Sequence, residues 1–291
     1  MISERLSRLR REMEQRHIDV YVVPTADFHE SEYVGAHFKA RSYITGFTGS
    51  AGTAIITMTE AGLWTDARYF LQAKHQLENT GVTLYRMGEE GVPTIMEYLR
   101  SALPEGGTLG FDGRVINAHL GAAFLALAGE KNAKLAVGED LVGVIWDDRP
   151  ELPHAPVRIL TAEYSGRSTA DKLADMRAEM EKQGASVHLL TSLYDIAWLL
   201  NVRGGDIDYV PVVLSYLALT EEQCLWFVQD AVLTDELRAY LAENRIETRP
   251  YESFYDYAAA IPAGETVLLD KGVCNYLLVS ELCEGVEIVD E

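Results

Sequence analysis

ARSYITGFTGSAGTAIITMTEAGLWTDARYF, residues 40–70, is the stretch around which the rest of the chain is organised. Three glycines recur at every third position over residues 46–52, and two β-rich runs follow at residues 53–57 and 63–65, separated by a turn-like Glu-Ala-Gly. This spacing predicts a tight loop that leads into a β-hairpin.

The three glycines do not make a nucleotide-binding motif. A dinucleotide fingerprint requires a Gly-x-Gly pair before its third glycine, and a phosphate-binding loop requires Gly-Lys followed by Ser or Thr. Neither pattern is present in residues 46–52, so we exclude a nucleotide cradle here.

The next residues, Asp66-Ala67-Arg68, predict a helix that Asp66 caps and that carries Arg68 in its first turn. A cation there faces the positive end of the helix dipole, which costs a few tenths of a kcal/mol unless an anion lies nearby. Broken local rules of this kind often mark functional positions. Two interpretations are therefore open: a surface ion pair of Arg68 with Asp66 or Glu78, or a functional cation.

Length and composition narrow the class of protein. A chain of 291 residues predicts two domains of about 150 residues each. Its 25 basic and 45 acidic residues give a net charge of -20, which disfavours nucleic acid and anionic membranes as partners. The charged start lacks a signal-peptide core and no run of 18 apolar residues occurs, so we expect a cytoplasmic protein.

Strands alternate with helices along the chain and predict an α/β fold with mixed sheets. Three prolines within residues 146–156 predict an extended linker. We therefore expect domain I at residues 1–150 and domain II at residues 157–291.

The second half repeats the first. Three blocks of the first half have counterparts in the second: residues 11–23 with 178–190, 42–47 with 197–202, and 62–64 with 224–226. This pattern indicates an internal duplication. After Trp226 the second copy has no counterpart of Arg68, and this asymmetry favours a function for Arg68 over a purely structural role.

Several blocks resemble the amino-terminal part of the cytosolic aminopeptidase P family, the Xaa-Pro aminopeptidases of the creatinase and methionine aminopeptidase superfamily. These blocks are SEY (31–33), GFTGSAGTAIIT (46–57), WTDARYFLQA (64–73), IWDDRPELP (145–153) and DIAWLLNVRGGDIDYVPVVLSY (195–216). The resemblance spans essentially the whole chain. It implies two tandem, duplicated creatinase N-terminal-like domains.

The family members are hydrolases that remove the first residue of a peptide when proline is second. The resemblance implies that two divalent ions, typically manganese, lie in a carboxyl-terminal pita-bread domain, held by two Asp, two Glu and one His, where they generate hydroxide. The family's metal motifs are not found in this chain. We therefore expect no catalytic residue and no metal ligand here, and no activity from this chain alone.

What remains for these domains is to shape the substrate cleft and to contribute homodimer contacts. One site residue follows from the resemblance: Arg68 matches the arginine of a WTDGRYF-like motif that helps to bind the short Xaa-Pro peptide substrate. The motif's usual glycine is Ala67 here. The alternative is a stand-alone binding or assembly module of creatinase type without peptidase activity, which a native stop after Glu291 would favour.

Other chemistry-bearing residues give weaker signals. The loop with His29, Glu30, Glu32 and His37 lacks the HExxH spacing, which disfavours a metal site. Three cysteines without CxxC spacing favour free buried thiols, with a disulfide between the last two as the alternative; they are Cys224, Cys274 and Cys283.

One further charged cluster lies in the second half, at Arg203, Asp206 and Asp208. Pairing of these side chains within their own loop is the simpler interpretation, and contact with a neighbouring domain or subunit is the alternative.

Overall fold

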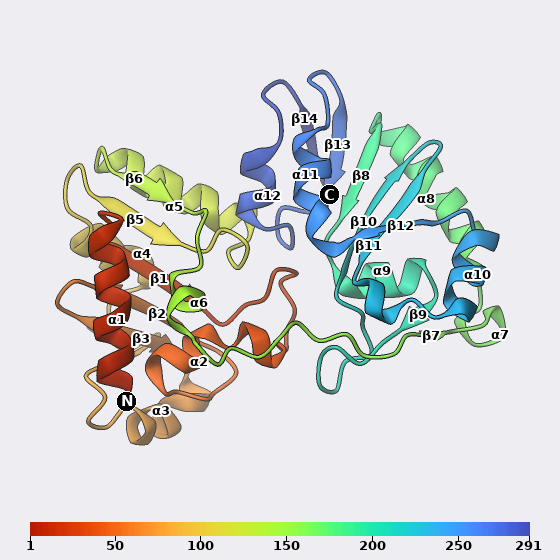
Figure 1. The fold of residues 1–291 in the computed structure, drawn as a ribbon. Coiled ribbons are helices and arrows are strands. Elements are labelled where there is room, and N and C mark those ends of the chain that lie inside the picture. The colour runs from red at the N-terminus through yellow and green to blue at the C-terminus, as the bar shows by residue number, and fades with distance from the viewer. The chain divides into compact units, whose positions relative to one another are not determined.

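A computed structural model describes residues 1–291, which pack as two units. Unit 1 comprises residues 1–27 and 36–151, and unit 2 comprises residues 28–35 and 152–291. Residues 28–35 thus pack with unit 2, although in sequence order they fall inside the first half. Each unit is built on its own six-stranded mixed sheet (Figure 1). Every helix falls short of the length and apolar character needed to cross a membrane.

The sheet of unit 1 has the strand order β4-β3-β2-β1-β5-β6. Its strands are β1 (Val20–Pro24), β2 (Thr53–Thr57), β3 (Ala61–Thr65), β4 (Thr83–Arg86), β5 (Thr108–Phe111) and β6 (Lys134–Ala136). The predicted hairpin is confirmed, because β2 pairs antiparallel with β3. Only β2 runs against the others, so the remaining five strands all end at one edge of the sheet.

The helices of unit 1 lie on both faces of this sheet. They are α1 (Ile2–Gln15), α2 (Ala40–Thr45), α3 (Phe70–Gln76), α4 (Ile95–Ala102), α5 (Ala118–Glu130) and α6 (Leu141–Ile145), with 3-10 turns η1 (Ala36–Phe38) and η2 (Ala67–Tyr69). As the helical spacing of its apolar residues predicts, α1 buries Leu6, Leu9 and Met13. These side chains form part of one hydrophobic core with strands β1 to β3.

Unit 2 repeats this topology, with the strand order β12-β11-β10-β8-β13-β14 and the same pattern of parallel and antiparallel pairs. Its strands are β8 (Val187–Leu190), β10 (Ser215–Thr220), β11 (Cys224–Val228), β12 (Glu247–Pro250), β13 (Thr266–Leu269) and β14 (Glu287–Asp290), and β7 (Arg158–Ile159) pairs separately with β9 (Val202–Arg203). The predicted duplicated α/β fold is confirmed.

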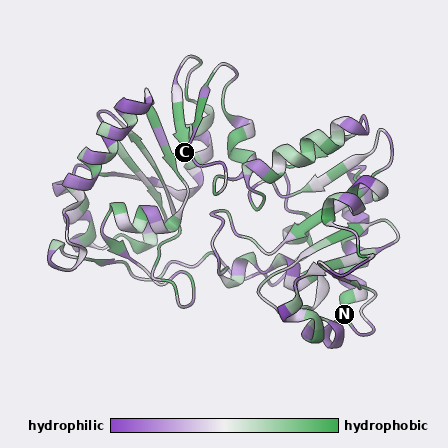
Figure 2. Ribbon diagram, turned by 180° about the vertical axis from the view of Figure 1, so that it is seen from behind, coloured by the Kyte–Doolittle hydropathy of each residue, from purple (hydrophilic) through white to green (hydrophobic).

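The helices of unit 2 correspond in order to most of those of unit 1. They are α7 (Ala162–Ser165), α8 (Thr169–Gln183), α9 (Leu193–Leu199), α10 (Asp235–Glu243), α11 (Phe254–Ala259) and α12 (Tyr276–Glu281), with 3-10 turns η3 (Asp230–Val232) and η4 (Tyr251–Ser253). Figure 2 shows green, hydrophobic strands in the sheets and purple, hydrophilic residues spread over the helices.

The duplication extends to single hydrogen bonds. In unit 1 the Arg10 Nε donates to the Thr57 carbonyl oxygen at 2.9 Å, and in unit 2 the Arg177 Nε donates to the Thr220 carbonyl oxygen at the same distance. The bond links α1 to the last residue of β2 in unit 1, and α8 to the last residue of β10 in unit 2. A bond kept in both copies indicates a structural role for these two arginines.

The proline-rich stretch 146–156 is hydrogen-bonded on both sides of the boundary between the units, which lies after Glu151. His37 Nδ1 lies 2.7 Å from the Pro150 carbonyl oxygen in unit 1, and Gln229 Nε2 donates to the Pro153 carbonyl oxygen at 2.6 Å in unit 2. Side chains therefore fix the path of this extended segment in addition to its prolines.

Thr94 is the N-cap of α4 and forms a capping box with Glu97.

All three cysteines are free, as the sequence favoured, so no bridge joins Cys274 to Cys283. The expectation of burial is wrong for Cys283, which is exposed.

Candidate functional site

The glycine loop 46–52 is held by Arg41, a cation that the sequence did not single out. Its side chain is only 3% exposed. The guanidinium donates to the carbonyl oxygens of Phe47 and Gly49, and Nε donates to Thr25 Oγ1 at 2.9 Å. Burial lowers the Arg41 pKa to about 10, so the group keeps its charge at neutral pH.

Backbone geometry and close packing explain the spacing of the three glycines. Gly46 ends α2 in the left-handed region, at φ 79°. A Cβ on Gly49 would overlap the Phe47 ring, and a Cβ on Gly52 would lie 3.0 Å from the Trp64 carbonyl oxygen. The glycines therefore serve the folding of the loop, in agreement with the exclusion of a nucleotide cradle.

The Asp66-Arg68 turn follows directly after β3. Asp66 caps η2, as predicted, by accepting from the Arg68 backbone nitrogen at 3.0 Å. The same carboxylate accepts from Arg68 Nε and Nη2, both at 2.9 Å. Asp66 is thus the anion that stabilises a cation at this helix start. The Arg68 side chain is nevertheless 70% exposed, so its guanidinium can be reached from solvent.

Tyr69 connects this turn to the glycine loop. Its hydroxyl lies 2.6 Å from Ser50 Oγ, and its ring meets the Phe47 ring edge-on at 5.8 Å between centroids. The Arg68 Cζ lies 5.3 Å from the centre of the Tyr69 ring. The buried Arg41 therefore fixes the loop, and the loop supports the residue beside Arg68.

The ion pair predicts a shift in titration. The Arg68 side-chain hydrogen bond is the largest cause that lowers the Asp66 pKa. In Arg68→Ala we expect the Asp66 pKa to rise toward its usual range, as followed by carboxyl NMR. Because the folded pKa is the lowered one, the pair stabilises the fold above the usual pKa and loses this effect as pH falls through the folded value.

Asp147 supplies the control carboxylate for this titration. Its pKa is lowered by a hydrogen bond from Arg8, not from Arg68. It should titrate identically in both proteins. An unchanged Asp66 pKa in the variant would show that the pair does not persist in solution.

The structure contains a second turn of the same kind that sequence reasoning missed. Asp112 follows β5 and accepts from the Arg114 backbone nitrogen at 3.0 Å and from Arg114 Nε and Nη2 at 2.9 Å. The signal was available, since both turns read Asp-x-Arg directly after a strand. The Arg114 side chain is less accessible, at 34% exposed.

Three arginines follow or end strands at one edge of the unit 1 sheet. Arg68 follows β3, Arg86 ends β4 and Arg114 follows β5, and these strands run in the same direction. Each of the three is ion-paired with a nearby carboxylate, that of Asp66, Glu89 or Asp112, so the edge carries no excess of positive charge. Among the three, Arg68 has the most exposed side chain.

The two loop histidines belong to different units. His29 is buried in unit 2, where Nδ1 lies 2.8 Å from the Thr191 carbonyl oxygen and Nε2 lies 2.7 Å from the Tyr251 hydroxyl. His37 belongs to unit 1. No three His, Cys, Asp or Glu side chains of residues 1–291 are arranged as metal ligands.

The charged loop of unit 2 does not form the expected ion pairs. Asp206 is buried and accepts from the backbone nitrogens of Ala155 and Leu214 at 2.7 and 2.8 Å, and burial raises its pKa. Arg203 Nη1 donates to the carbonyl oxygens of Ala197 and Val202. The simpler interpretation was wrong because backbone groups satisfy both charges.

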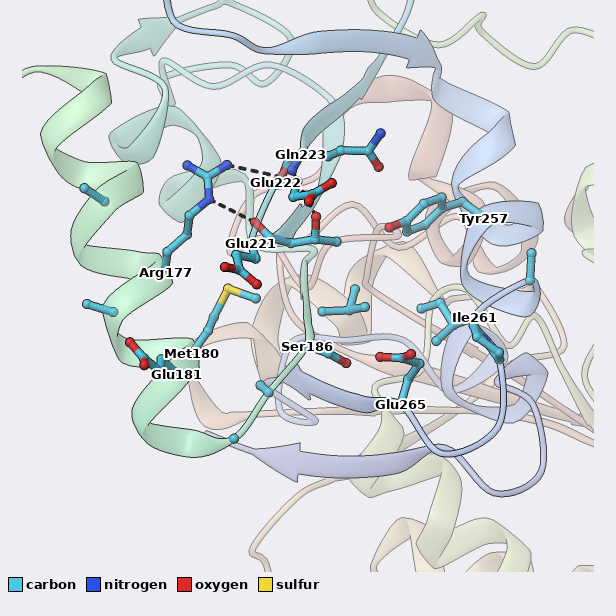
Figure 3. Close-up of a pocket in the computed structure, with 18 residues that line it drawn as sticks. Arg177, Met180, Glu181, Ser186, Glu221, Glu222, Gln223, Tyr257, Ile261 and Glu265 are labelled. Carbon is cyan, nitrogen blue, oxygen red and sulfur yellow. Dashed lines mark hydrogen bonds between the residues drawn. The ribbon is translucent and has the colours of Figure 1, made fainter.

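An open pocket of about 980 Å³ lies in unit 2 (Figure 3). Four glutamates line it together with apolar side chains: Glu181, Glu221, Glu222 and Glu265. The only cation, Arg177, is bonded to the Thr220 and Gln223 carbonyl oxygens. No nucleophile and base are paired in it. All three thiols lie outside it, and burial raises the pKa of Cys224 and Cys274 to about 12.

Two family models, both described as Creatinase/Prolidase N-terminal domain, match the chain. One matches residues 5–142 and the other matches residues 148–291. Together they account for both structural units.

Similar proteins are substantially longer than this chain. Aminopeptidase P2 of Arabidopsis thaliana is 37% identical over 286 residues, covering 96% of this chain and 40% of that protein. A probable Xaa-Pro aminopeptidase P of Penicillium rubens is 42% identical over 262 residues, covering 89% and 42%. The chain thus spans about two fifths of the length of these curated relatives.

A solved structure that matches the whole chain is also found. It is the X-prolyl aminopeptidase of Caenorhabditis elegans, described as a cytosolic enzyme with a di-nuclear active site. The TM-score is 0.92 at 28% sequence identity, and the match covers 100% of this chain and 50% of that one.

Proposed function

Because this chain belongs to the Creatinase/Prolidase N-terminal domain family, with one such domain in each half, we propose that it is the non-catalytic amino-terminal region of a Xaa-Pro aminopeptidase. The observation that carries the proposal is the combination of 37–42% identity to such enzymes with a match to only two fifths of their length. In this role the two units shape the substrate cleft, contribute to homodimer contacts and act in the cytoplasm.

Arg68 is the residue that we assign to substrate binding. Its planar guanidinium can offer paired hydrogen bonds to a peptide carbonyl or terminal carboxylate. Support comes from its accessibility, from its position at the arginine-bearing edge of unit 1, and from the absence of a counterpart in unit 2. Asp66 and Tyr69 would act as positioning residues, since the Asp66 carboxylate accepts hydrogen bonds from the Arg68 guanidinium and the Tyr69 ring packs against it.

The metal pair of the complete enzyme is assigned to polypeptide outside these residues. Side chains of residues 1–291 do not fit it, because none of them gather into a group of three metal ligands. We propose that two divalent ions, manganese by family resemblance, lie in a carboxyl-terminal domain of the complete enzyme. No step of the reaction is assigned to the present residues beyond binding the peptide and limiting access to it.

An activity assay tests the proposal that catalysis requires polypeptide outside residues 1–291. The 291-residue chain, supplied with manganese and a Xaa-Pro peptide, is expected to show no turnover above background. The complete polypeptide under the same conditions should cleave the peptide before proline. Robust hydrolysis by the 291-residue chain would refute the proposal.

A stand-alone binding or assembly module is the second candidate. The duplicated fold and the acidic surface suit such a role as well as they suit a part of an enzyme. The native reading frame distinguishes the two, because metal ligands encoded downstream support the enzyme and a native stop after Glu291 supports the module.

A further inference from the structure

Because the two units share one topology, the sheet face that carries α1 and α2 in unit 1 can be compared with the face that carries α8 and α9 in unit 2. In unit 1 this face is covered by α6, which packs against α1 and α2. The apolar side chains of α6, Leu141, Val142 and Ile145, are fully buried there. The helix is short, but it completes the core of the unit.

Two aromatic side chains anchor this cover in unit 1. The Tyr21 hydroxyl donates to the Glu139 carbonyl oxygen at 2.9 Å and accepts from the Leu141 backbone nitrogen at 3.0 Å. The Tyr43 ring stacks on Trp146, directly after α6, at 4.5 Å between centroids. Tyr21 thus fixes the start of α6 and Tyr43 fixes the residue that follows it.

Unit 2 has equivalent residues at both anchor positions. His188 occupies the position of Tyr21, as both are second residues of their strands and both pair in parallel with the strand that follows in the sheet. Trp198 occupies the position of Tyr43. In each unit a cation from the first long helix lies over this ring: Arg5 at 3.9 Å and Lys172 at 4.3 Å.

In unit 2, however, no helix equivalent to α6 follows the last strand within residues 1–291. His188 Nδ1 is buried without a hydrogen-bond partner, and the Trp198 side chain is 48% exposed. A cavity of about 190 Å³ is lined by both residues together with Met176 of α8. The equivalent cavity beside Tyr21 in unit 1 measures about 20 Å³, because α6 supplies Val142 to its wall.

We propose that this face of unit 2 is a docking site for a short apolar helix of the same polypeptide, located just past Glu291 and equivalent to α6. Residues 137–140 connect β6 to α6. A connection of the same length after β14, which ends at Asp290, places the start of the helix directly beyond the 291 residues. The relatives are long enough to contain such a segment.

The chemistry of the face specifies this helix. Apolar residues spaced as Leu141, Val142 and Ile145 are required to fill the cavity, and a flat or aromatic side chain is required against Trp198. A backbone group at the helix start meets His188 Nδ1, as Leu141 meets Tyr21. Asp195 and Asp270 also line the cavity, so a basic residue near the helix is favoured by charge.

Covalent connection is the reason to assign a segment of the same chain instead of a second copy or another protein. A short connection to β14 gives the helix a high effective concentration at this face. Unit 1 has such a connection, because α6 follows β6 in the chain after four residues, 137–140. The inference rests on the proposed function in one respect, that the polypeptide continues past Glu291. Given that continuation it concerns packing only, so docking can fail while the peptidase assay of the complete polypeptide succeeds, and the two failures are distinguishable.

The test compares the 291-residue chain with a chain extended by the next fifteen or so native codons. Quenching of Trp198 by acrylamide, taken as the difference from Trp198→Phe in each chain, is expected to fall severalfold on extension. The melting temperature of unit 2 is expected to rise by about 5 °C or more. Unchanged quenching and melting, or a native stop after Glu291, would overturn the proposal.

His188→Leu distinguishes docking at His188 from a general stabilising effect of the extension, because only docking predicts opposite changes in melting temperature in the two chains. In the 291-residue chain the substitution removes an unsatisfied buried nitrogen and should raise the melting temperature. In the extended chain it removes a hydrogen-bond partner of the helix and should lower the melting temperature. The same sign of change in both chains would contradict docking at His188. Met58→Leu, on the exposed hairpin of unit 1, is the control that should leave both chains unchanged.

Discussion

Arg68→Ala in the complete polypeptide is expected to lower kcat/KM for a Xaa-Pro peptide by about 10- to 100-fold, because hydrogen bonds to a charged group contribute about 1.5–3 kcal/mol. The melting temperature should change by about 1 °C or less, since the exposed pair with Asp66 contributes little to stability. Steady-state kinetics and thermal unfolding of the same preparations provide the two measurements.

Two further variants make this result specific. Arg68→Lys keeps the charge but loses the planar fork, so an intermediate loss is expected if paired hydrogen bonds matter. Arg100→Ala is the matched control, because Arg100 is also an exposed, ion-paired arginine of unit 1, bonded to Glu130 at 3.0 Å. Its kinetics should match those of the parent. Kinetics of Arg68→Ala equal to those of Arg100→Ala would refute a substrate-binding role.

Arg41→Ala is expected to lower the free energy of unfolding of unit 1 by about 3–5 kcal/mol, because it leaves several buried acceptors without a donor. These acceptors are the carbonyl oxygens of Phe47 and Gly49 and the Thr25 hydroxyl. The loop that supports Tyr69 and Arg68 depends on them. Urea denaturation, with hydrogen exchange of the β2 and β3 amides, measures the loss.

The comparison for this variant is Arg11→Ala, an exposed residue of α1, which should change stability by about 0.5 kcal/mol or less. Arg41→Lys should recover part of the loss, since a single ammonium can reach some of the acceptors but not all of them. A loss below about 1 kcal/mol in Arg41→Ala would show that water replaces the guanidinium and that the loop does not require it.

Long, regular elements were predictable because their pattern is local. The apolar spacing of α1 and the β-rich runs of β2 and β3 lie within single windows of sequence. The elements that were missed are short or lie at sheet edges. α6 has only five residues, and the edge strand β12 reads Glu-Thr-Arg-Pro, with no apolar alternation to reveal it.

The candidate site was predictable only in part, for the same reason. The cap at Asp66 is local, so the sequence indicated it and the structure confirmed it. Arg41 looked like an ordinary polar residue, because its acceptors lie in a loop that folds back over it. The shared Asp-x-Arg pattern at Asp66 and Asp112 is visible in the sequence, but only the sheet shows that both turns lie at one edge.

The amino-acid sequence by itself determined the α/β class, the duplication and the family, since these depend on periodicity and on motifs along the chain. Tertiary structure alone decided which charges are buried and which arginine remains accessible. It also decided which face of unit 2 lacks a helix equivalent to α6, which covers the same face of unit 1. The reason is physical: burial and hydrogen-bond satisfaction depend on contacts between residues far apart in sequence, and those contacts exist only in the folded chain.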